Sequence, residues 1–289
     1  MSPTTRLHSP LVAVAELQSE LAGAAPPLLL DASFELADPA AGRRAWEQAH
    51  VPGSRHVDLE ADLCGPRTGR NGRHPLPDRA AFARTAAGLG VVPGRSVVVL
   101  DRGDGAFAAR LWWMLRWLGH ADVRVLDGGL KAWTAAGGEG VAGDWTPPPA
   151  AAPYPERAPL VATIDADTLQ ARLADVRLID ARGAARYRGE VEPIDPVAGH
   201  IPGALNRPYT DNLAPDGLFL SPPQLRQAFV ALGLTPEQPR VVVSQCGSGV
   251  TACHNLLALE VAGLPGGLLY SGSWSEWCAD PARPVATGA

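Results

Sequence analysis

Short apolar runs alternate with stretches of helical periodicity along the chain. In the first half, this pattern predicts strands at 28–32, 96–101 and 123–126 and helices at 78–89 and 106–118. Strands that alternate with helices are typical of a parallel sheet covered on both faces. Because the functional loops of such sheets follow the carboxyl ends of the strands, we expect the chemistry of the protein in those loops.

The second half of the chain repeats the first. The matching pairs of segments are 28–32 with 178–181, 50–53 with 200–203, and 97–99 with 241–243. Between the two copies, the sequence is rich in proline and predicts an extended tether. We therefore expect two homologous domains, at 1–144 and 160–289, joined by a linker at 145–159.

A cysteine follows the apolar strand at 241–243. After Cys246 come two glycines, Gly247 and Gly249, and then a helix predicted to begin at Thr251. Glycine allows the backbone to curl inward, which would aim successive N–H groups and the helix N-terminus into one concavity. Such a concavity favours the thiolate, which is the nucleophilic form of cysteine, and would also hold an anionic persulfide. The weaker alternative is a buried structural thiol.

The internal repeat provides a control for this interpretation. Aligning Val97 with Val241 places Arg102 opposite Cys246. A guanidinium group cannot replace a nucleophilic sulfur. We therefore expect the first domain to be catalytically silent and to form a wall of the site.

Composition and charge limit the kinds of partner that we expect the protein to bind. The chain has 289 residues, 46% of them hydrophobic, and a formal net charge of −5. Nucleic-acid binding requires a basic surplus, and a membrane span requires about 18 continuous apolar residues, so we expect neither partner. The N-terminus lacks a signal-peptide pattern. The four cysteines are Cys64, Cys246, Cys253 and Cys278. Their spacing suggests neither a disulfide framework nor a metal site, which predicts a cytoplasmic protein with reduced thiols and no metal.

Several motifs together resemble those of the two-domain rhodanese superfamily of sulfurtransferases. They are Cys-Gly-Ser-Gly-Val-Thr at 246–251, His-x-Pro-Gly at 50–53 and 200–203, and Asp-Ala-Arg at 180–182. The resemblance implies an α/β fold with two tandem rhodanese-like domains, each a mostly parallel sheet flanked by helices. It also implies that the cysteine takes sulfur from a donor, becomes a persulfide, and passes the sulfur to a thiol or cyanide acceptor, with thioredoxin as a candidate. No cofactor is needed, because the sulfur chemistry takes place on the cysteine.

The loop after Cys246 also bears on the donor. Members of the family that prefer thiosulfate tend to have Arg or Lys in this loop, whereas the uncharged loop here resembles that of the 3-mercaptopyruvate sulfurtransferases. The substrate would contact the loop at Gly247, Gly249, Val250 and Thr251. Thiosulfate is the alternative donor, and a persulfide carrier that relays sulfur between proteins is the alternative function.

The resemblance further implies a relay of three side chains. Asp58 follows the first His-x-Pro-Gly box, His74 precedes a Pro-Leu-Pro segment, and Ser248 lies in the cysteine loop. A serine hydroxyl joined to a histidine could donate a proton to the departing substrate group or polarise it. The alternatives are a helix cap or turn for Asp58 and a solvated loop residue for His74.

A donor carboxylate requires a cation, and the resemblance assigns this role to Arg186. A guanidinium offers a carboxylate two parallel N–H groups, although a structural salt bridge is the alternative. The family usually has a second arginine after a Glu-Pro pair, but here Ile194 follows Glu192 and Pro193. Arg188 is the substitute that the sequence suggests.

Two other classes of protein share features with this chain. Cysteine-dependent phosphatases share the strand, loop and helix layout but need an arginine six residues after the cysteine, where this chain has Ala252. A regulatory rhodanese-like module without activity is disfavoured by the intact Cys246 and its glycines. Cys253 is interpreted as a core thiol, and His50 and His200 as braces of their turns.

Overall fold

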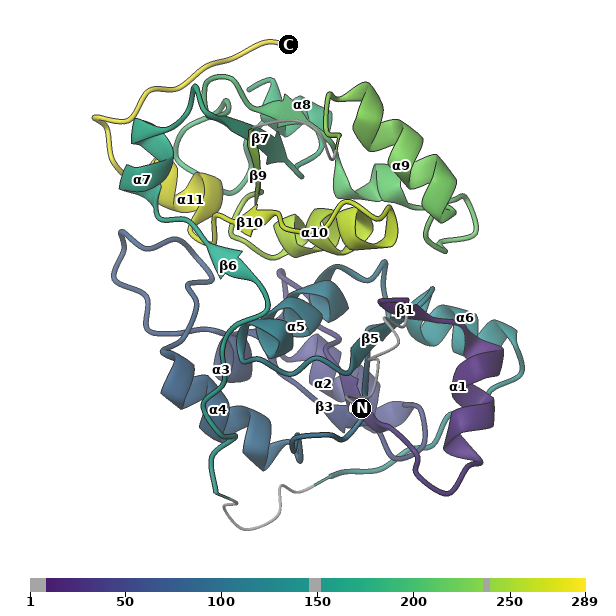
Figure 1. Cartoon of the computed structure of the whole chain (residues 1–289). Coiled ribbons are helices and arrows are strands. Elements are labelled where there is room, and N and C mark those ends of the chain that lie inside the picture. The colour runs from purple at the N-terminus through teal and green to yellow at the C-terminus, as the bar shows by residue number, and fades with distance from the viewer. Residues whose placement is uncertain (1–8, 146–151, 236–239) are drawn as a thin grey trace, which may run out of the picture.

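The computed structural model describes residues 9–145, 152–235 and 240–289. Two lobes lie one above the other, and each contains a parallel sheet flanked by helices (Figure 1). In the first lobe the sheet order is β1-β5-β4-β2-β3. Its strands are β1 (Leu11–Val12), β2 (Leu28–Asp31), β3 (Arg55–His56), β4 (Val97–Leu100) and β5 (Val123–Leu126). Its helices are α1 (Val14–Leu21), α2 (Ala41–Gln48), α3 (Leu59–Leu63), α4 (Arg79–Gly88), α5 (Ala106–Trp117) and α6 (Gly129–Ala135).

The second lobe repeats this topology, with the order β6-β10-β9-β7-β8. Its strands are β6 (Ala162–Thr163), β7 (Val176–Asp180), β8 (Leu205–Asn206), β9 (Val241–Gln245) and β10 (Leu268–Leu269). Its helices are α7 (Ala166–Ala171), α8 (Ala184–Tyr187), the 3-10 helix η1 (Tyr209–Asn212), α9 (Pro222–Ala231), α10 (Thr251–Val261) and α11 (Ser273–Trp277). The same strand order in both lobes confirms the predicted α/β class, with two tandem units that each contain a parallel sheet flanked by helices.

The predicted elements of the first domain end within two residues of the observed ones. The strands β2 and β4 are buried along their whole length, as expected for apolar runs without alternation. The helix α4 begins after Asp78, whose carboxylate accepts the N–H groups of Ala80 and Ala81. The two-residue strands are too short to produce a pattern in the sequence, and they were not predicted.

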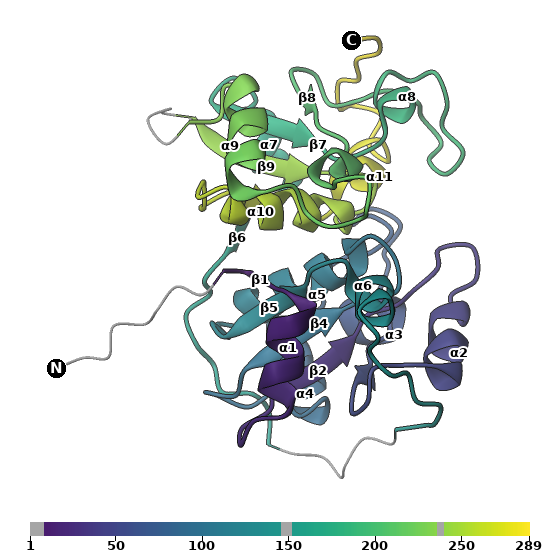
Figure 2. The same ribbon diagram turned by 90° about the vertical axis from the view of Figure 1, so that its right-hand side faces the viewer.

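The two domains share one apolar core. Helix α5 of the first domain packs against α10 of the second, and the two lie side by side at the boundary in both ribbon views (Figures 1 and 2). Leu111 and Trp112 belong to the same buried cluster as Leu256 and Leu257. An ion pair of 2.9 Å between Arg116 Nη2 and Glu260 Oε1 adds to this contact. The packed boundary holds the ends of β4 and β9 in a defined relation.

Part of the predicted linker lies on the first domain. Tyr154 is buried, its N–H donates to the carbonyl of Ala83 at 3.0 Å, and its hydroxyl lies 3.1 Å from His120 Nδ1. The segment from 152 to 159, in the predicted linker, is therefore anchored on the first domain. Residues 146–151 of the predicted linker lie outside the described residues, and the exact domain boundaries stay predictions.

Membrane insertion through a helix finds no support in the described ranges. None of their helices has both the length and the apolar character that a span demands.

Candidate active site

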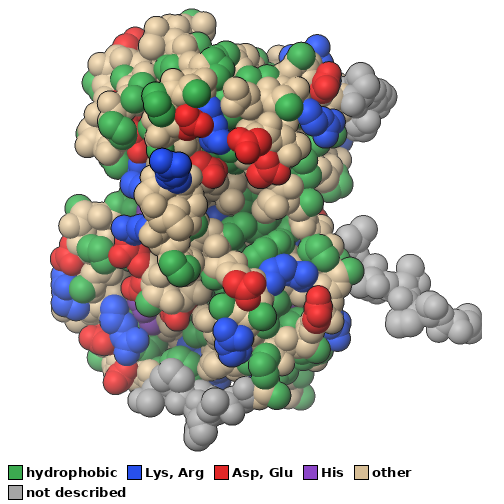
Figure 3. All heavy atoms as spheres, turned by 90° about the vertical axis from the view of Figure 1, so that its left-hand side faces the viewer, with side chains coloured by type: hydrophobic (Ala, Val, Ile, Leu, Met, Phe, Trp, Pro, Cys, Tyr) green, Lys and Arg blue, Asp and Glu red, His purple; other side chains and the backbone are tan. Residues whose placement is uncertain are grey.

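A cavity of about 420 Å³ lies where the two domains meet. In the space-filling view the molecule narrows between its two lobes (Figure 3). The first domain lines the cavity with residues from three loops or helix ends: Leu36, Arg73, Gly103, Asp104, Ala106 and Phe107. The second domain contributes the loops after β7 and β9: Ala181, Arg182, Gly183, Arg186, Ile194, Tyr209, Cys246, Gly247, Ser248, Val250 and Thr251.

Cys246 lies between β9 and α10, at the floor of this cavity. Its side chain is buried, and its Sγ atom accepts the N–H group of Gly249 at 3.2 Å. Within the described ranges, no acceptor takes the four remaining N–H groups of the loop, which belong to Gly247, Ser248, Val250 and Thr251. The loop thus has the concavity of open amide donors that its glycines suggest.

The carbonyl groups of the loop are held on its outer side. The oxygens of Cys246 and Gly247 accept the N–H groups of Trp274 and Ser275 at 2.9 and 3.0 Å, at the start of α11. The oxygen of Gly249 accepts Nη1 of the buried Arg110 at 3.0 Å. These three carbonyls are therefore paired, whereas four N–H groups of the loop have no acceptor among the described residues.

Sequence reasoning missed both residues that fix the loop from behind. Ser273 Oγ accepts the N–H of Cys246 at 3.0 Å, and Ser273 has a φ of 54°, the only positive φ of a non-glycine residue in the described chain. Arg110 reaches the loop from α5 of the other domain and also donates to the carbonyl of His74 at 3.2 Å. The Gly-Ser-Trp segment at 272–274 was a visible signal for Ser273, whereas the role of Arg110 depends on how the domains pack.

The corresponding loop of the first domain is filled by its own side chain. The carboxylate of Asp101 accepts four backbone N–H groups, those of Gly103, Gly105, Phe107 and Ala108. In the repeat, these positions correspond to 247, 249, 251 and 252 of the second domain. The burial of Asp101 raises its pKa to about 6, although these hydrogen bonds act in the opposite direction.

Arg102, the residue that the repeat aligns with Cys246, points away from this loop. Its Nη1 donates to the carbonyl of Ala49 at 2.7 Å and to that of Ala45 at 3.3 Å. The first-domain loop that corresponds to the cysteine loop therefore has neither a thiol nor an open concavity, and the catalytic silence of this domain stays a prediction.

The structure brings His74 and Ser248 together from different domains. His74 Nδ1 lies 2.8 Å from Ser248 Oγ, and the imidazole is only 3% exposed. Burial, reinforced by the positive charge of Arg110, lowers the pKa of His74 to about 3. His74 is therefore a neutral hydrogen-bond partner of Ser248 near pH 7.

The structure does not bring Asp58 into this pair. Its carboxylate caps α3, where Oδ1 accepts the N–H groups of Glu60 and Ala61 at 2.8 Å each. No hydrogen bond or ion pair joins Asp58 to His74, both of which are described. The relay expected from the resemblance is thus reduced to two members, and Asp58 has the capping role that was its alternative.

The low pKa of His74 has a consequence for stability. The unfolded chain binds a proton at this histidine as the pH falls below about 6.5, whereas the folded protein does so only near pH 3. Stability is therefore present above pH 6.5 and is lost as the pH falls, by at most about 1.4 kcal/mol per pH unit for this group. We expect His74→Asn to flatten this dependence, which urea unfolding at pH 7, 6 and 5 measures.

The comparison isolates His74 because the other buried histidines, including His120 and His254, whose pKa values burial also lowers, are common to both proteins. The pKa of His254, which burial lowers to about 4, contributes the same slope to each. Equal slopes for the wild type and His74→Asn would contradict the assignment.

Arg186 and Arg188 occupy different environments. Arg186 lines the cavity, and its Nη2 donates to Glu192 Oε1 at 2.6 Å and to Asp195 Oδ2 at 3.1 Å. Arg188 is more exposed, donates to Glu190 at 2.6 Å, and does not line the cavity. The expectation that Arg188 replaces the missing second arginine is therefore wrong, because alternate residues at the end of α8 point in different directions.

A different arginine lies beside Arg186. A Cβ atom on Gly247 would be 3.0 Å from Arg73 Nη2 and 3.5 Å from Arg186 Nη1. Arg73 belongs to the first domain and forms an ion pair with Asp195. Sequence reasoning missed Arg73 because no local pattern reports a contact across the domain boundary, although its position next to His74 was a signal.

Of the other three thiols, Cys253 and Cys278 are buried and Cys64 is partly buried. Cys253 is fully buried, and its Sγ donates to the carbonyl of Gly249 at 3.4 Å. Burial raises the pKa of Cys253 to about 12 and the pKa values of Cys64 and Cys278 to about 11. Thiols with such pKa values are poor nucleophiles near neutral pH.

The two His-x-Pro-Gly boxes have matching contacts. His50 Nδ1 bonds to the carbonyl of Trp46 at 2.7 Å, and His200 Nδ1 bonds to that of Tyr187 at 2.8 Å. Each imidazole also stacks on the aromatic ring of the residue whose carbonyl it bonds to, with ring centroids 4.0 Å apart for His50 and 3.8 Å apart for His200. These contacts fit the interpretation of both histidines as braces.

The fold and the loop together define a class of α/β protein, with a cysteine in an amide-lined concavity between a buried strand and a helix. The family model described as "Rhodanese-like domain" matches residues 13–136 and 165–280. The chain belongs to the rhodanese-like family and contains two of its domains.

Known relatives match over most of their length. A Pseudomonas aeruginosa protein named "Probable 3-mercaptopyruvate sulfurtransferase" is 53% identical over 265 residues, which are 90% of this chain and 92% of that protein. The thiosulfate sulfurtransferase of Mus musculus is 35% identical over 269 residues, 90% of this chain and 88% of its own. The structure of 3-mercaptopyruvate sulfurtransferase from Leishmania major superposes with a TM-score of 0.82 at 30% identity, covering 96% of this chain and 75% of that one.

Proposed function

We propose that this protein is a sulfurtransferase that moves sulfur from 3-mercaptopyruvate, through a persulfide on Cys246, to a thiol or cyanide acceptor. The observation that carries the proposal is the position of Cys246 Sγ, 3.2 Å from the nitrogen of Gly249, in a cavity-lining loop where four further N–H groups have no acceptor among the described residues. Backbone donors of this kind stabilise an anionic sulfur both before and after it receives a second sulfur atom.

The donor half-reaction needs only the thiolate of Cys246 and the donor itself. The thiolate of Cys246 attacks the sulfur of 3-mercaptopyruvate, and a sulfur–sulfur bond forms. The carbon–sulfur bond breaks, and its electron pair passes to the carbon of the pyruvate enolate. The enolate takes up the proton that the donor thiol brought, which leaves pyruvate and the deprotonated persulfide of Cys246.

Ser248 and His74 fit the enolate step. When His74 Nδ1 carries the imidazole proton, it donates to Ser248 Oγ across the 2.8 Å contact. The Ser248 hydroxyl is then free to donate into the cavity that Ser248 lines. A donor at that point stabilises the negative charge that develops on the substrate carbonyl oxygen. Arg186, which lines the same cavity, would bind the donor carboxylate.

Thiosulfate is the alternative donor, and the names of the relatives include both activities. Thiosulfate has no carbonyl group for Ser248 to polarise, which favours 3-mercaptopyruvate as the donor. A persulfide carrier is the second alternative. Thioredoxin as acceptor and a cytoplasmic location stay predictions from the sequence.

Donor preference separates these functions. We expect kcat/KM for 3-mercaptopyruvate to exceed that for thiosulfate by at least about tenfold, a difference in activation free energy of about 1.4 kcal/mol. Steady-state rates with cyanide as acceptor measure both donors under the same conditions. If thiosulfate is the better donor by that factor, the donor assignment is wrong and the enzyme class survives. If neither donor is turned over but Cys246 accepts sulfur from a protein persulfide, the carrier function is correct.

A further inference from the structure

We propose that Asp104 of the first domain is the base of the acceptor half-reaction, and that the acceptor is therefore a thiol that arrives with its proton. This inference rests on the proposed function and deepens it, because it chooses a thiol over an anionic acceptor such as cyanide. It also gives the wall that the first domain contributes a chemical part in the reaction.

The first support is the distribution of charge around the cavity. Arg73, Arg182 and Arg186 line it, whereas Asp104 is the only acidic residue among its described lining residues. Each arginine forms an ion pair with a carboxylate outside the lining: Arg73 with Asp195, Arg182 with Asp180, and Arg186 with Glu192. Arginine cannot accept a proton near neutral pH, so Asp104 is the base that this cavity offers.

The second support is that the carboxylate of Asp104 has room for another partner. Its Oδ2 accepts the hydroxyl of Tyr209 at 2.6 Å, and its Oδ1 accepts the N–H of Ala106 at 3.4 Å. In the part of the chain that the structure describes, no other donor reaches either oxygen, and no cation pairs with Asp104. Because a contact of 3.4 Å is a weak hydrogen bond, Oδ1 can take a donor from a molecule in the cavity.

Tyr209 links this carboxylate to the catalytic domain. It belongs to η1 of the second domain and also lines the cavity. Burial raises the pKa of Tyr209, and its hydrogen bond to Asp104 and the charge of Cys246 act in the same direction. The hydroxyl therefore stays protonated and orients Asp104, within electrostatic reach of the nucleophilic sulfur.

The main chain of Asp104 is fixed by the second domain as well. Asn212 Nδ2 donates to His254 Nδ1 at 3.2 Å, so Nε2 carries the proton of this imidazole and donates it to the carbonyl of Asp104 at 3.2 Å. Burial lowers the pKa of His254 to about 4, which keeps the ring neutral near pH 7. Asp104 is thus held at its side chain and at its backbone before an acceptor enters, and a preorganised base needs little rearrangement.

The internal repeat relates Asp104 to Ser248. Aligning Val97 with Val241 places these two residues opposite each other, and both line the cavity, each from the loop of its own domain. In the proposed donor half-reaction Ser248 donates a hydrogen bond to the substrate. A carboxylate at the aligned position suits the opposite task, which is to accept a proton from the second substrate.

The acceptor half-reaction balances with Asp104 as a proton shuttle. Asp104 takes the proton of the acceptor thiol while the acceptor sulfur attacks the outer sulfur of the persulfide. A sulfur–sulfur bond forms between them, and the bond from the outer sulfur to Cys246 Sγ breaks, with its electron pair left on Sγ. Asp104 then returns the proton to the transferred sulfur, which leaves a hydropersulfide of the acceptor and the Cys246 thiolate.

The test compares an acceptor that carries a thiol proton with one that does not. Cys246 is loaded with inorganic polysulfide, excess reagent is removed, and mass spectrometry follows the loss of the added sulfur in a single turnover. The acceptors are 2-mercaptoethanol and sulfite, which becomes thiosulfate without any proton transfer. In Asp104→Asn, the ratio of the rate constants for 2-mercaptoethanol and sulfite is expected to fall by at least about tenfold, a modest share of what a positioned base contributes.

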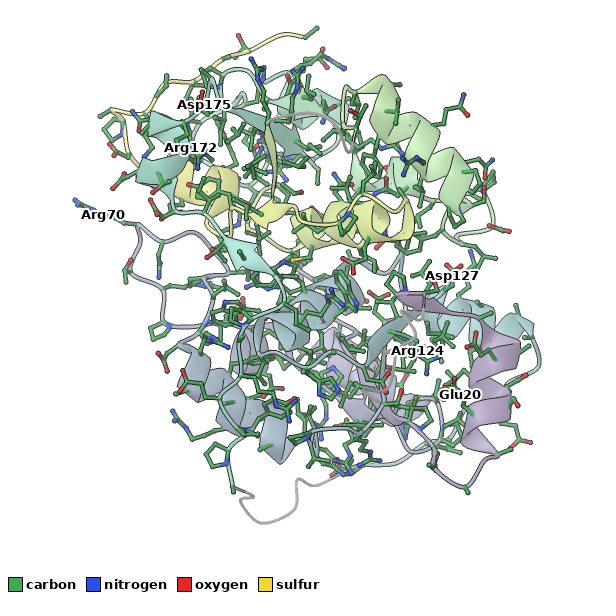
Figure 4. The ribbon with its side chains drawn as sticks, in the orientation of Figure 1. Glu20, Arg70, Arg124, Asp127, Arg172 and Asp175 are labelled. Atoms are coloured by element: carbon green, nitrogen blue, oxygen red, sulfur yellow. The ribbon has the colours of Figure 1, made fainter. Side chains whose placement is uncertain are left out.

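Two comparisons separate this effect from a structural one. Asparagine has the shape of aspartate and keeps an oxygen for the Tyr209 hydroxyl, and an undiminished rate with sulfite would show an intact loop. Asp175→Asn is the matched control, because Asp175 is exposed and lies in the second lobe away from the domain boundary (Figure 4). Its ratio is expected to equal that of the wild type.

Each outcome decides the proposal. A smaller fall in the ratio for Asp104→Asn, or an equal loss with both acceptors, would overturn the role of Asp104 as the base. Loading from polysulfide makes the test independent of the donor, so a wild type that fails to react with 3-mercaptopyruvate would contradict the proposed function alone. A wild type that takes no sulfur from polysulfide at Cys246 would overturn both.

Discussion

Cys246→Ser is expected to lose sulfur transfer from every donor, with kcat/KM at least about 10⁴-fold below that of the wild type. The removal of a catalytic nucleophile has an effect of this order or larger in other enzymes that form covalent intermediates. The serine hydroxyl is protonated near pH 7 and cannot form a persulfide, so no intermediate is available. The same N–H group of Gly249 that contacts Sγ would then face a neutral oxygen. Steady-state kinetics measure the loss of turnover, and the mass of the donor-treated protein shows whether a sulfur atom has been added.

Cys253→Ser is the matched control. Cys253 is fully buried seven positions further along the chain, and its raised pKa of about 12 makes it unreactive. We expect Cys253→Ser to retain the added sulfur at position 246 and a kcat/KM within a few-fold of the wild type. Sulfur found on another cysteine of Cys246→Ser, together with residual turnover above about 1%, would contradict the assignment of the nucleophile.

The parts of the fold that the sequence predicts are those encoded by local patterns. The fully apolar runs at 97–99 and 241–243 predict strands, which are β4 and β9 in the structure, and the glycine turn followed by the run from Thr251 predicts the helix α10. The cysteine loop is equally local, since a strand, two glycines and a helix start determine where its N–H groups point. The repeat adds the second domain without further information.

The parts that the sequence does not predict depend on how the two domains meet. Arg73 and Asp195 are far apart in the chain, and only docking of the first-domain loop on α11 brings them together. Arg188 had the correct charge and neighbourhood in the sequence but is oriented toward Glu190. Asp58 illustrates a different kind of error. Its sequence context suggested a helix cap and the resemblance suggested a relay, and its contacts in the structure are those of a helix cap.

The two loops of the repeat reveal what the shared backbone requires. An N–H-lined concavity is costly to bury empty, because each unpaired donor loses its hydration. The first domain satisfies it with the carboxylate of Asp101, which is permanently attached. The second domain has Gln245 at the aligned position, whose side chain makes no hydrogen bond in the described structure, and leaves the concavity for the sulfur of Cys246. The first copy thus holds a carboxylate in the concavity where the second copy holds a sulfur.

Gly249→Ala is expected to reduce kcat/KM for 3-mercaptopyruvate by at least about 10²-fold, comparable to the loss of one oxyanion-hole donor. Gly249 has a φ of +80°, and a Cβ on it would lie 2.3 Å from the carbonyl oxygen of Ser271. That oxygen belongs to the backbone and cannot rotate away, so the loop itself must move. Movement withdraws the N–H of Gly249 from its 3.2 Å contact with Sγ. Steady-state kinetics measure the loss, and the rate of persulfide formation locates it in the donor half-reaction.

Gly203→Ala separates the clash from the backbone conformation. Gly203 lies in the same domain with a φ of +79°, but a Cβ there would meet nothing within 4 Å. Both substitutions place a side chain in the left-handed region, at a conformational cost of about 1–2 kcal/mol. We therefore expect similar small decreases in Tm from that cost, with kcat/KM of Gly203→Ala within about twofold of the wild type. If Gly249→Ala were as active as Gly203→Ala, the close approach of the loop to Ser271 would not be what holds the amide on the sulfur, and the anion would have to be stabilised chiefly by the helix N-terminus of α10.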